Sequence, residues 1–122
     1  MTISDPDLPG QRDPGVLARP EFRQGLAEIT RRGLVFDAAV VQSQLGELVD
    51  LSRAAPDATI VLNNTGTPLG IGRYADRRTE AFAEWRAGMA EVAKCPNIFV
   101  KIGGLNMAFT GLAVADARAK LF

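Results

Sequence analysis

Three short apolar runs alternate with amphipathic segments along this chain. The runs cover residues 34–41 (LVFDAAVV), 59–64 (TIVLNN) and 97–105 (NIFVKIGGL). A nearly continuous apolar run between turn residues is typical of a strand that is buried on both faces. The segments before and between the runs carry apolar residues at helical spacing. Helices that alternate with strands predict βαβ units, and hence an α/β fold with a parallel sheet.

Local signals set the expected bounds of the helices. Pro20 suits the first turn of one helix and Gly33 its end, while Ser43 is expected to cap the next helix. A long helix is predicted over roughly 76–94, with a buried stripe of four residues: Phe82, Trp85, Met89 and Val92. The chain then divides into an irregular lead-in, a domain and a tail that could form a short helix: residues 1–19, 20–112 and 113–122.

The composition limits the classes of function and the cellular location that can be expected. Lys+Arg and Asp+Glu number 14 each among the 122 residues, so bulk charge favours neither nucleic acid nor an anionic membrane. No apolar run approaches the roughly 20 residues of a membrane span, and the N-terminus does not resemble a signal peptide. The single cysteine, Cys95, indicates a reducing compartment, so a cytoplasmic protein is expected. The chain has no histidine, so any mechanism must work without the usual general base and metal ligand.

The ends of the predicted strands hold the candidate functional residues. Ligands of parallel α/β proteins bind at the carboxyl ends of the strands and in the loops that follow. Those ends carry Gln42 with Ser43, then Asn64 before a glycine-rich loop, and Lys101 before GGLNM. Lys101 lies in an apolar strand, where it could hold a carboxylate or a developing oxyanion, or extend to solvent at the end of the sheet.

The loop at 65–78 (TGTPLGIGRYADRR) supplies further candidates. Its glycines match neither the phosphate-binding loop nor the dinucleotide fingerprint. Arg73 and Tyr74 could reach an anionic substrate, although such a cluster is more often a solvated helix start. Asp37, inside the first strand, could pair with Lys101 or an arginine, or be a buried hydrogen-bonded group. Cys95 has no histidine partner and is expected to be a small buried residue.

Longer stretches of the sequence resemble a known family. Within residues 17–112 the words GLVFD, PDATIVLNN and EWRAGMAEVAKCPNIFVKIGGL resemble the amidohydrolase-related (amidohydrolase 2) hydrolases, which include L-fuconolactonase and 2-pyrone-4,6-dicarboxylate lactonase. The resemblance implies a (β/α)8 TIM barrel, which typically needs about 250 residues. The chain is then expected to be a partial barrel holding about strands five to seven. The resemblance also implies a small carboxylate or lactone substrate and, in some members, a divalent zinc or manganese ion.

Two positions depart from the family pattern. Gln42, in VQSQL, and Asn64, in NNTG, stand where the family usually has histidines. Neither amide titrates near neutral pH, and amides are poor ligands for a catalytic transition metal. The family's His-x-His pair on the first strand and its aspartate on the eighth fall outside this part of the barrel. We therefore expect no intact catalytic set and no bound metal or other cofactor in this chain. Lys101 matches the family word VKxGGL, which implies that it points into the barrel mouth.

These observations predict a truncated and catalytically impaired member of the family. One alternative is a hydrolase that is active only when a partner chain supplies the missing strands. Another is a non-catalytic module for binding or assembly. A three-stranded parallel sheet without the rest of the barrel exposes apolar edges and an apolar inner face. Such a sheet is expected to self-associate, to pair with a complementary half-barrel, or to fold poorly.

Overall fold

The computed structural model describes residues 2–6 and 14–104. Helices and strands alternate as predicted, and short 3₁₀ helices lie at Val16–Ala18, Gln42–Gln44, Asn63–Gly66 and Gly72–Tyr74. The main elements, in chain order, are α1 (Pro20–Arg31), β1 (Phe36–Ala38), α2 (Leu45–Ala54), β2 (Ile60–Leu62), α3 (Arg78–Val92) and β3 (Ile98–Val100). The first 3₁₀ helix lies within the predicted lead-in, and the predicted tail at 113–122 falls outside the described residues.

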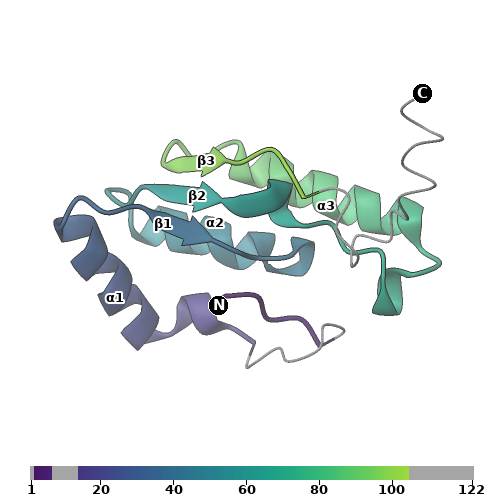
Figure 1. The fold of residues 1–122 in the computed structure, drawn as a ribbon, viewed down its shortest axis with the longest axis horizontal. Coiled ribbons are helices and arrows are strands. Elements are labelled where there is room, and N and C mark those ends of the chain that lie inside the picture. The colour runs from purple at the N-terminus through teal and green to yellow at the C-terminus, as the bar shows by residue number, and fades with distance from the viewer. Residues whose placement is uncertain (1, 7–13, 105–122) are drawn as a thin grey trace.

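The three strands form one parallel sheet in the order β1-β2-β3. Phe36 pairs with Ile60, which pairs with Ile98 on its other side. Figure 1 shows α2 and α3 on the same side of the sheet, with α1 beside β1. The predicted α/β fold with a parallel sheet is therefore confirmed. Because the strands are parallel and in register, their carboxyl ends, and the loops that follow, meet at one edge.

The core lies between the sheet and the helices. Alternate residues of the strands point into it, and the same cluster takes in the apolar faces of the helices. Its fully buried members include Ala38, Ile60, Leu62, Leu48 and Leu51. Gly88 of α3 lets α2 and α3 approach, because a Cβ there would lie 2.7 Å from Cδ1 of Leu45.

The other face of the sheet is open to solvent, so the prediction of strands buried on both faces is wrong. Asp37 of β1 and Phe99 of β3 lie on this face and are exposed. Val35, on the approach to β1, is exposed as well, and β1 is shorter than the predicted run. None of the described helices covers this side (Figure 1), so the apolar sequence of the strands exceeds what this part of the fold buries.

The helix bounds follow local chemistry. Pro20 opens α1, and Gly33, with a φ of 70°, turns the chain after it, as predicted. The buried stripe of α3 is only partly as predicted, because Phe82 is exposed and Ala81 is buried in its place. The Phe82 ring instead lies against Trp85, with centroids 5.5 Å apart. No helix of the described ranges has the length and apolar character needed to cross a bilayer.

Candidate functional site

Gln42 begins the 3₁₀ helix that follows β1 and is buried. Its Oε1 accepts a hydrogen bond of 2.8 Å from the backbone N–H of Leu69, in the glycine-rich loop. Its Nε2 is buried and has no hydrogen-bond partner among the described residues. The Gln42 side chain therefore ties the end of β1 to the loop after β2.

The turn after β2 has an unusual backbone. Four consecutive residues have positive φ: Asn64 (53°), Thr65 (52°), Gly66 (71°) and Thr67 (39°). A left-handed conformation is strained for the two β-branched threonines. Hydrogen bonds to other elements hold the turn: among them, the N–H of Thr65 donates to the carbonyl of Lys101 at 3.1 Å, and Trp85 Nε1 donates to the carbonyl of Thr65 at 2.7 Å. The rest of the fold therefore fixes the backbone that carries Asn64.

The glycine pair after β3 packs directly on this turn. A Cβ on Gly104 would lie 2.6 Å from the Cβ of Asn64, closer than two such atoms approach in proteins, and Gly104 has a φ of 73°. Gly103 and Gly104 therefore let the loop after β3 approach Asn64. The two glycines of the KIGG segment thus allow the end of β3 to pack against the end of β2.

Lys101, one residue beyond β3, lies on the open face of the sheet. Its backbone N–H donates to the carbonyl of Leu62, and its Nζ donates to Oδ2 of Asp37 across the sheet at 2.9 Å. The two side chains are 57% and 54% exposed. The pairing of Asp37 with Lys101 is one of the arrangements that the sequence allowed. The alternative of a buried Asp37 is wrong, because its face of the sheet is open.

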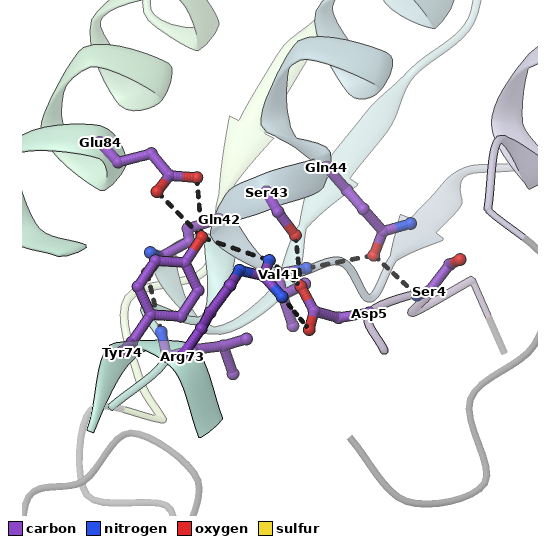
Figure 2. Close-up of polar contacts among 10 residues, drawn as sticks. Ser4, Asp5, Val41, Gln42, Ser43, Gln44, Arg73, Tyr74 and Glu84 are labelled. Atoms are coloured by element: carbon purple, nitrogen blue, oxygen red, sulfur yellow. Dashed lines mark hydrogen bonds and ion pairs between the residues drawn. The ribbon is translucent and has the colours of Figure 1, made fainter. Parts of the chain in front are cut away.

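Arg73 and Tyr74 belong to a second cluster at the same edge, which the sequence did not predict (Figure 2). Arg73 donates from Nη1 to Oδ1 of Asp5 at 3.0 Å and from Nη2 to Oδ2 at 2.7 Å. The Asp5 side chain is 1% exposed. This hydrogen bonding to Asp5 is the main reason that the pKa of Arg73 lies above its ordinary value.

Ser43 adds a third donor to the same carboxylate. Its Oγ donates to Oδ2 of Asp5 at 2.7 Å. The prediction that Ser43 caps the second helix is wrong, because α2 begins at Leu45 and has no side-chain cap hydrogen bond. The hydroxyl instead binds a residue 38 positions earlier in the chain. Nothing in the lead-in sequence distinguishes Asp5 from its two other acidic residues, Asp7 and Asp13, so this contact has no signal in the sequence.

Tyr74 supports the arginine from the other side. The Arg73 guanidinium lies 4.6 Å from the centre of the Tyr74 ring, and Nη2 approaches the hydroxyl at 3.3 Å. That hydroxyl donates to the Glu84 carboxylate of α3, with oxygens at 2.9 and 3.0 Å. Tyr74 is buried, so the cluster is anchored to the core of the glycine-rich loop.

The segment that carries Asp5 is also held through Gln44. The N–H of Ser4 donates to Gln44 Oε1 at 2.8 Å, and Gln44 Nε2 donates to the carbonyl of Thr2 at 2.9 Å. The Thr2 hydroxyl donates to the carbonyl of Ala39, just after β1. Residues 2–6 therefore lie across the carboxyl end of β1.

The donor set at the strand ends does not fit a zinc or manganese ion. Gln42 and Asn64 offer amide oxygens, and the Gln42 oxygen already accepts the Leu69 N–H. Within residues 2–6 and 14–104, no group of three or more His, Cys, Asp or Glu side chains is placed to hold a metal. We therefore derive no step of a reaction through a metal ion in this chain.

Comparison with known proteins places these features in a family. A family model described as Amidohydrolase matches residues 4–122. The uncharacterized protein y4mH of Sinorhizobium fredii is 38% identical over 95 residues, which are 78% of this chain and 30% of that protein. An L-fucono-1,5-lactonase of Burkholderia multivorans is 29% identical over 85 residues, 70% of this chain and 28% of the lactonase. This chain thus spans about a third of the length of these relatives.

Solved structures agree with the fold. An amidohydrolase from Burkholderia multivorans, crystallised with bound HEPES, superposes with a TM-score of 0.69 at 27% identity, over 84% of this chain and 36% of that one. The zinc-bound crystal form gives 0.68 at 25% identity over the same shares. The three parallel strands and the helices between them therefore correspond to part of a TIM barrel, as predicted. The chain belongs to the amidohydrolase family.

Proposed function

We propose that this chain forms part of a lactonase-like amidohydrolase barrel and does not itself supply the catalytic groups of the hydrolysis. The amidohydrolase relationship is established by the family match. The lactone substrate class is our extension from the 29% identity to the Burkholderia lactonase. Hydrolysis of a lactone requires a group that takes a proton from water near neutral pH. Neither amide at the histidine places of the family can do so.

The observation that carries this proposal is the position of Gln42. Its Oε1 is engaged by the Leu69 N–H at 2.8 Å, and the residue is 3% exposed. A buried amide in this setting fixes the loop rather than activating water. Asn64 sits on a strained turn against the glycines after β3, which favours a positioning role there too.

Three residues remain candidates for contact with a substrate. Lys101 lies on the open face with its ammonium on Asp37, so a carbonyl or carboxylate that enters this face meets a half-exposed cation. Arg73 and Tyr74 lie at the same edge of the sheet and suit an anionic group. We propose that these side chains bind a small carboxylate or lactone, while proton transfer depends on groups that this chain does not provide.

The test is a hydrolysis assay of the purified chain on a set of sugar lactones, with zinc or manganese added. A pH indicator monitors the acid that hydrolysis releases. We expect no rate above that of the buffer with the same metal. Turnover that the Lys101→Ala substitution abolishes would overturn the proposal. An equal rate in both proteins would indicate a contaminating hydrolase and would leave the expected result in place.

A second candidate function is catalysis by complementation with a partner chain. The open face of the sheet favours it, because Val35 and Phe99 are exposed apolar side chains. The side chains on the corresponding face of a TIM barrel fill its interior. Co-expression of this chain with the remaining part of the Burkholderia lactonase tests the idea. Copurification that Phe99→Asp abolishes would support it, and copurification that this change leaves intact would contradict it.

A further inference from the structure

We propose that Arg73 and Ser43 form a binding site for a carboxylate ligand, and that Asp5 of the same chain fills this site. The inference deepens the proposed role of Arg73 in substrate binding. It names the ligand group, a planar carboxylate, and it identifies the residue that competes with that ligand.

The geometry is that of a built carboxylate site. The two terminal nitrogens of Arg73 each meet one oxygen of Asp5, at 3.0 and 2.7 Å, which is the paired arrangement that matches a planar carboxylate. The Ser43 hydroxyl adds a bond of 2.7 Å to the second oxygen. Three donors from two distant parts of the chain thus converge on one carboxylate.

The site is fixed before any carboxylate enters it. Tyr74 lies under the guanidinium, and its hydroxyl is in turn bound by Glu84 of α3. Ser43 stands in the 3₁₀ helix that leads into α2. Because these anchors belong to the loop after β2 and to helix starts in the core, removal of Asp5 leaves the donors in place. Such preorganised donors lower the cost of ligand binding.

The position of the cluster suits an external ligand. It lies at the carboxyl edge of the parallel sheet, where α/β proteins bind their ligands. The Arg73 side chain is 38% exposed although the carboxylate of Asp5 is buried, so the guanidinium is reachable from solvent. Asp5 comes from a short segment, residues 2–6, whose Ser4 N–H donates to the Gln44 side chain beside β1 (Figure 2). A ligand carboxylate would take the place of Asp5 and release this segment.

The experiment is chemical rescue of the Asp5→Ala variant. Its thermal midpoint is measured by circular dichroism in increasing sodium acetate, with sodium chloride added to keep the ionic strength constant. We expect the midpoint to rise by about 5 °C between 0 and roughly 100 mM acetate, because the ion binds only the folded protein. If the variant is unfolded in buffer, the measurement becomes the folded fraction at 10 °C as a function of acetate, with the same expectation.

Two variants identify the site of the effect. Asp5→Asn fills the same volume with an amide and is expected to show no response to acetate. Asp57→Ala removes an exposed carboxylate elsewhere and is also expected to show none. The response of Asp5→Ala should disappear when Arg73→Ala is added.

The outcomes separate this inference from the proposed function. No rescue of Asp5→Ala, or rescue that persists without Arg73, overturns the carboxylate site. Equal rescue by chloride would show a general salt effect and overturn it as well. The rescue assay requires no turnover, so a failure of the catalytic proposal does not change how the rescue is interpreted. Rescue of the variant, in turn, gives no information about catalysis.

Discussion

Two ion pairs at the same edge of the sheet differ in burial rather than in distance. Asp5 and Arg73 approach to 2.7 Å, and Asp37 and Lys101 to 2.9 Å. The first carboxylate is 1% exposed and the second 54%. The first carboxylate is bound by both terminal nitrogens of the guanidinium and by a hydroxyl, whereas the second meets one ammonium on the open face.

The two pairs differ in how far water screens their charges. An exposed pair is screened by water and contributes about 0–1 kcal/mol. A buried carboxylate that loses its partner is strongly destabilising, because the charge remains without solvation. The Asp5 carboxylate and the Arg73 and Ser43 groups that bind it therefore form a cluster around a buried charge within the described residues. The Asp37–Lys101 pair lies on a face that in a whole barrel would be interior.

The largest effect is expected from Arg73→Ala. This change leaves the Asp5 carboxylate buried without its guanidinium partner, so we expect a loss of about 3 kcal/mol in the free energy of unfolding. Asp5→Ala should cost about half as much, because the half-exposed guanidinium can be solvated by water. Urea unfolding at pH 7 measures both.

Arg77→Ala is the matched control for this comparison. Arg77 also pairs with a carboxylate, Glu80, at 2.6 Å, but both side chains are 62% exposed. We expect a change within about 0.5 kcal/mol. If Arg77→Ala costs as much as Arg73→Ala, burial does not explain the difference between the two pairs.

The second-largest loss of stability is expected in the loop after β3. Gly104→Ala places a Cβ 2.6 Å from that of Asn64 and forces a left-handed alanine, so we expect a loss of about 2 kcal/mol. Gly33→Ala has a similar φ of 70° but nothing within 4 Å of the added atom, and should cost about 1 kcal/mol. The gap between the two unfolding energies measures the contact with Asn64, and equal losses would show that no such contact exists in solution.

The sequence predicted the order of elements and the edge that holds the candidate residues, because apolar periodicity and the rule for parallel strands depend on local sequence. The apolar pattern alone could not predict the open face, since an apolar strand has the same sequence pattern whether or not its second face is covered. The exposed Asp37 and Phe99 follow from that single difference. The exposed inner face was expected only from the resemblance, which implied part of a barrel.

The candidate site was predictable only in its strand-end members. Gln42, Asn64 and Lys101 follow strands, so their edge could be inferred. The role of Asp5 depends on contacts 38 and 68 residues away in sequence, and no local pattern encodes them. The expected cap at Ser43 failed because α2 begins two residues later, at Leu45, and the Ser43 hydroxyl instead donates to the distant Asp5 carboxylate.

A third carboxylate, Glu47 of α2, extends the comparison to a group without a cation. Burial raises its pKa, the Gly15 amide opposes that shift, and its Oε2 has no hydrogen-bond partner among the described residues. A raised pKa means that the folded protein holds the proton more tightly than the unfolded chain. Stability should then fall as the pH rises through the folded pKa.

Glu47→Gln should therefore be more stable than the original protein at pH 7, and the advantage should vanish below about pH 4, where both states of Glu47 are protonated. Urea midpoints at pH 7 and 3.5 give the comparison. Glu91→Gln is the opposite control, because Lys94 lowers the pKa of Glu91 and the original protein should be favoured at pH 7. A Glu47→Gln protein less stable at pH 7 would show that the carboxylate has a partner in solution.

The smallest effect is expected at Lys101. The Lys101→Ala change removes the exposed ammonium from Asp37, and a double-mutant cycle with Asp37→Ala should give a coupling within about 0.5 kcal/mol. Asp5 and Arg73 in the same cycle should give several times more. A coupling above about 1.5 kcal/mol between Lys101 and Asp37 would mean that the open face is covered in solution, because only loss of water makes such a pair strong. Repeating the cycle at low and high protein concentration then tells whether a second copy provides the cover.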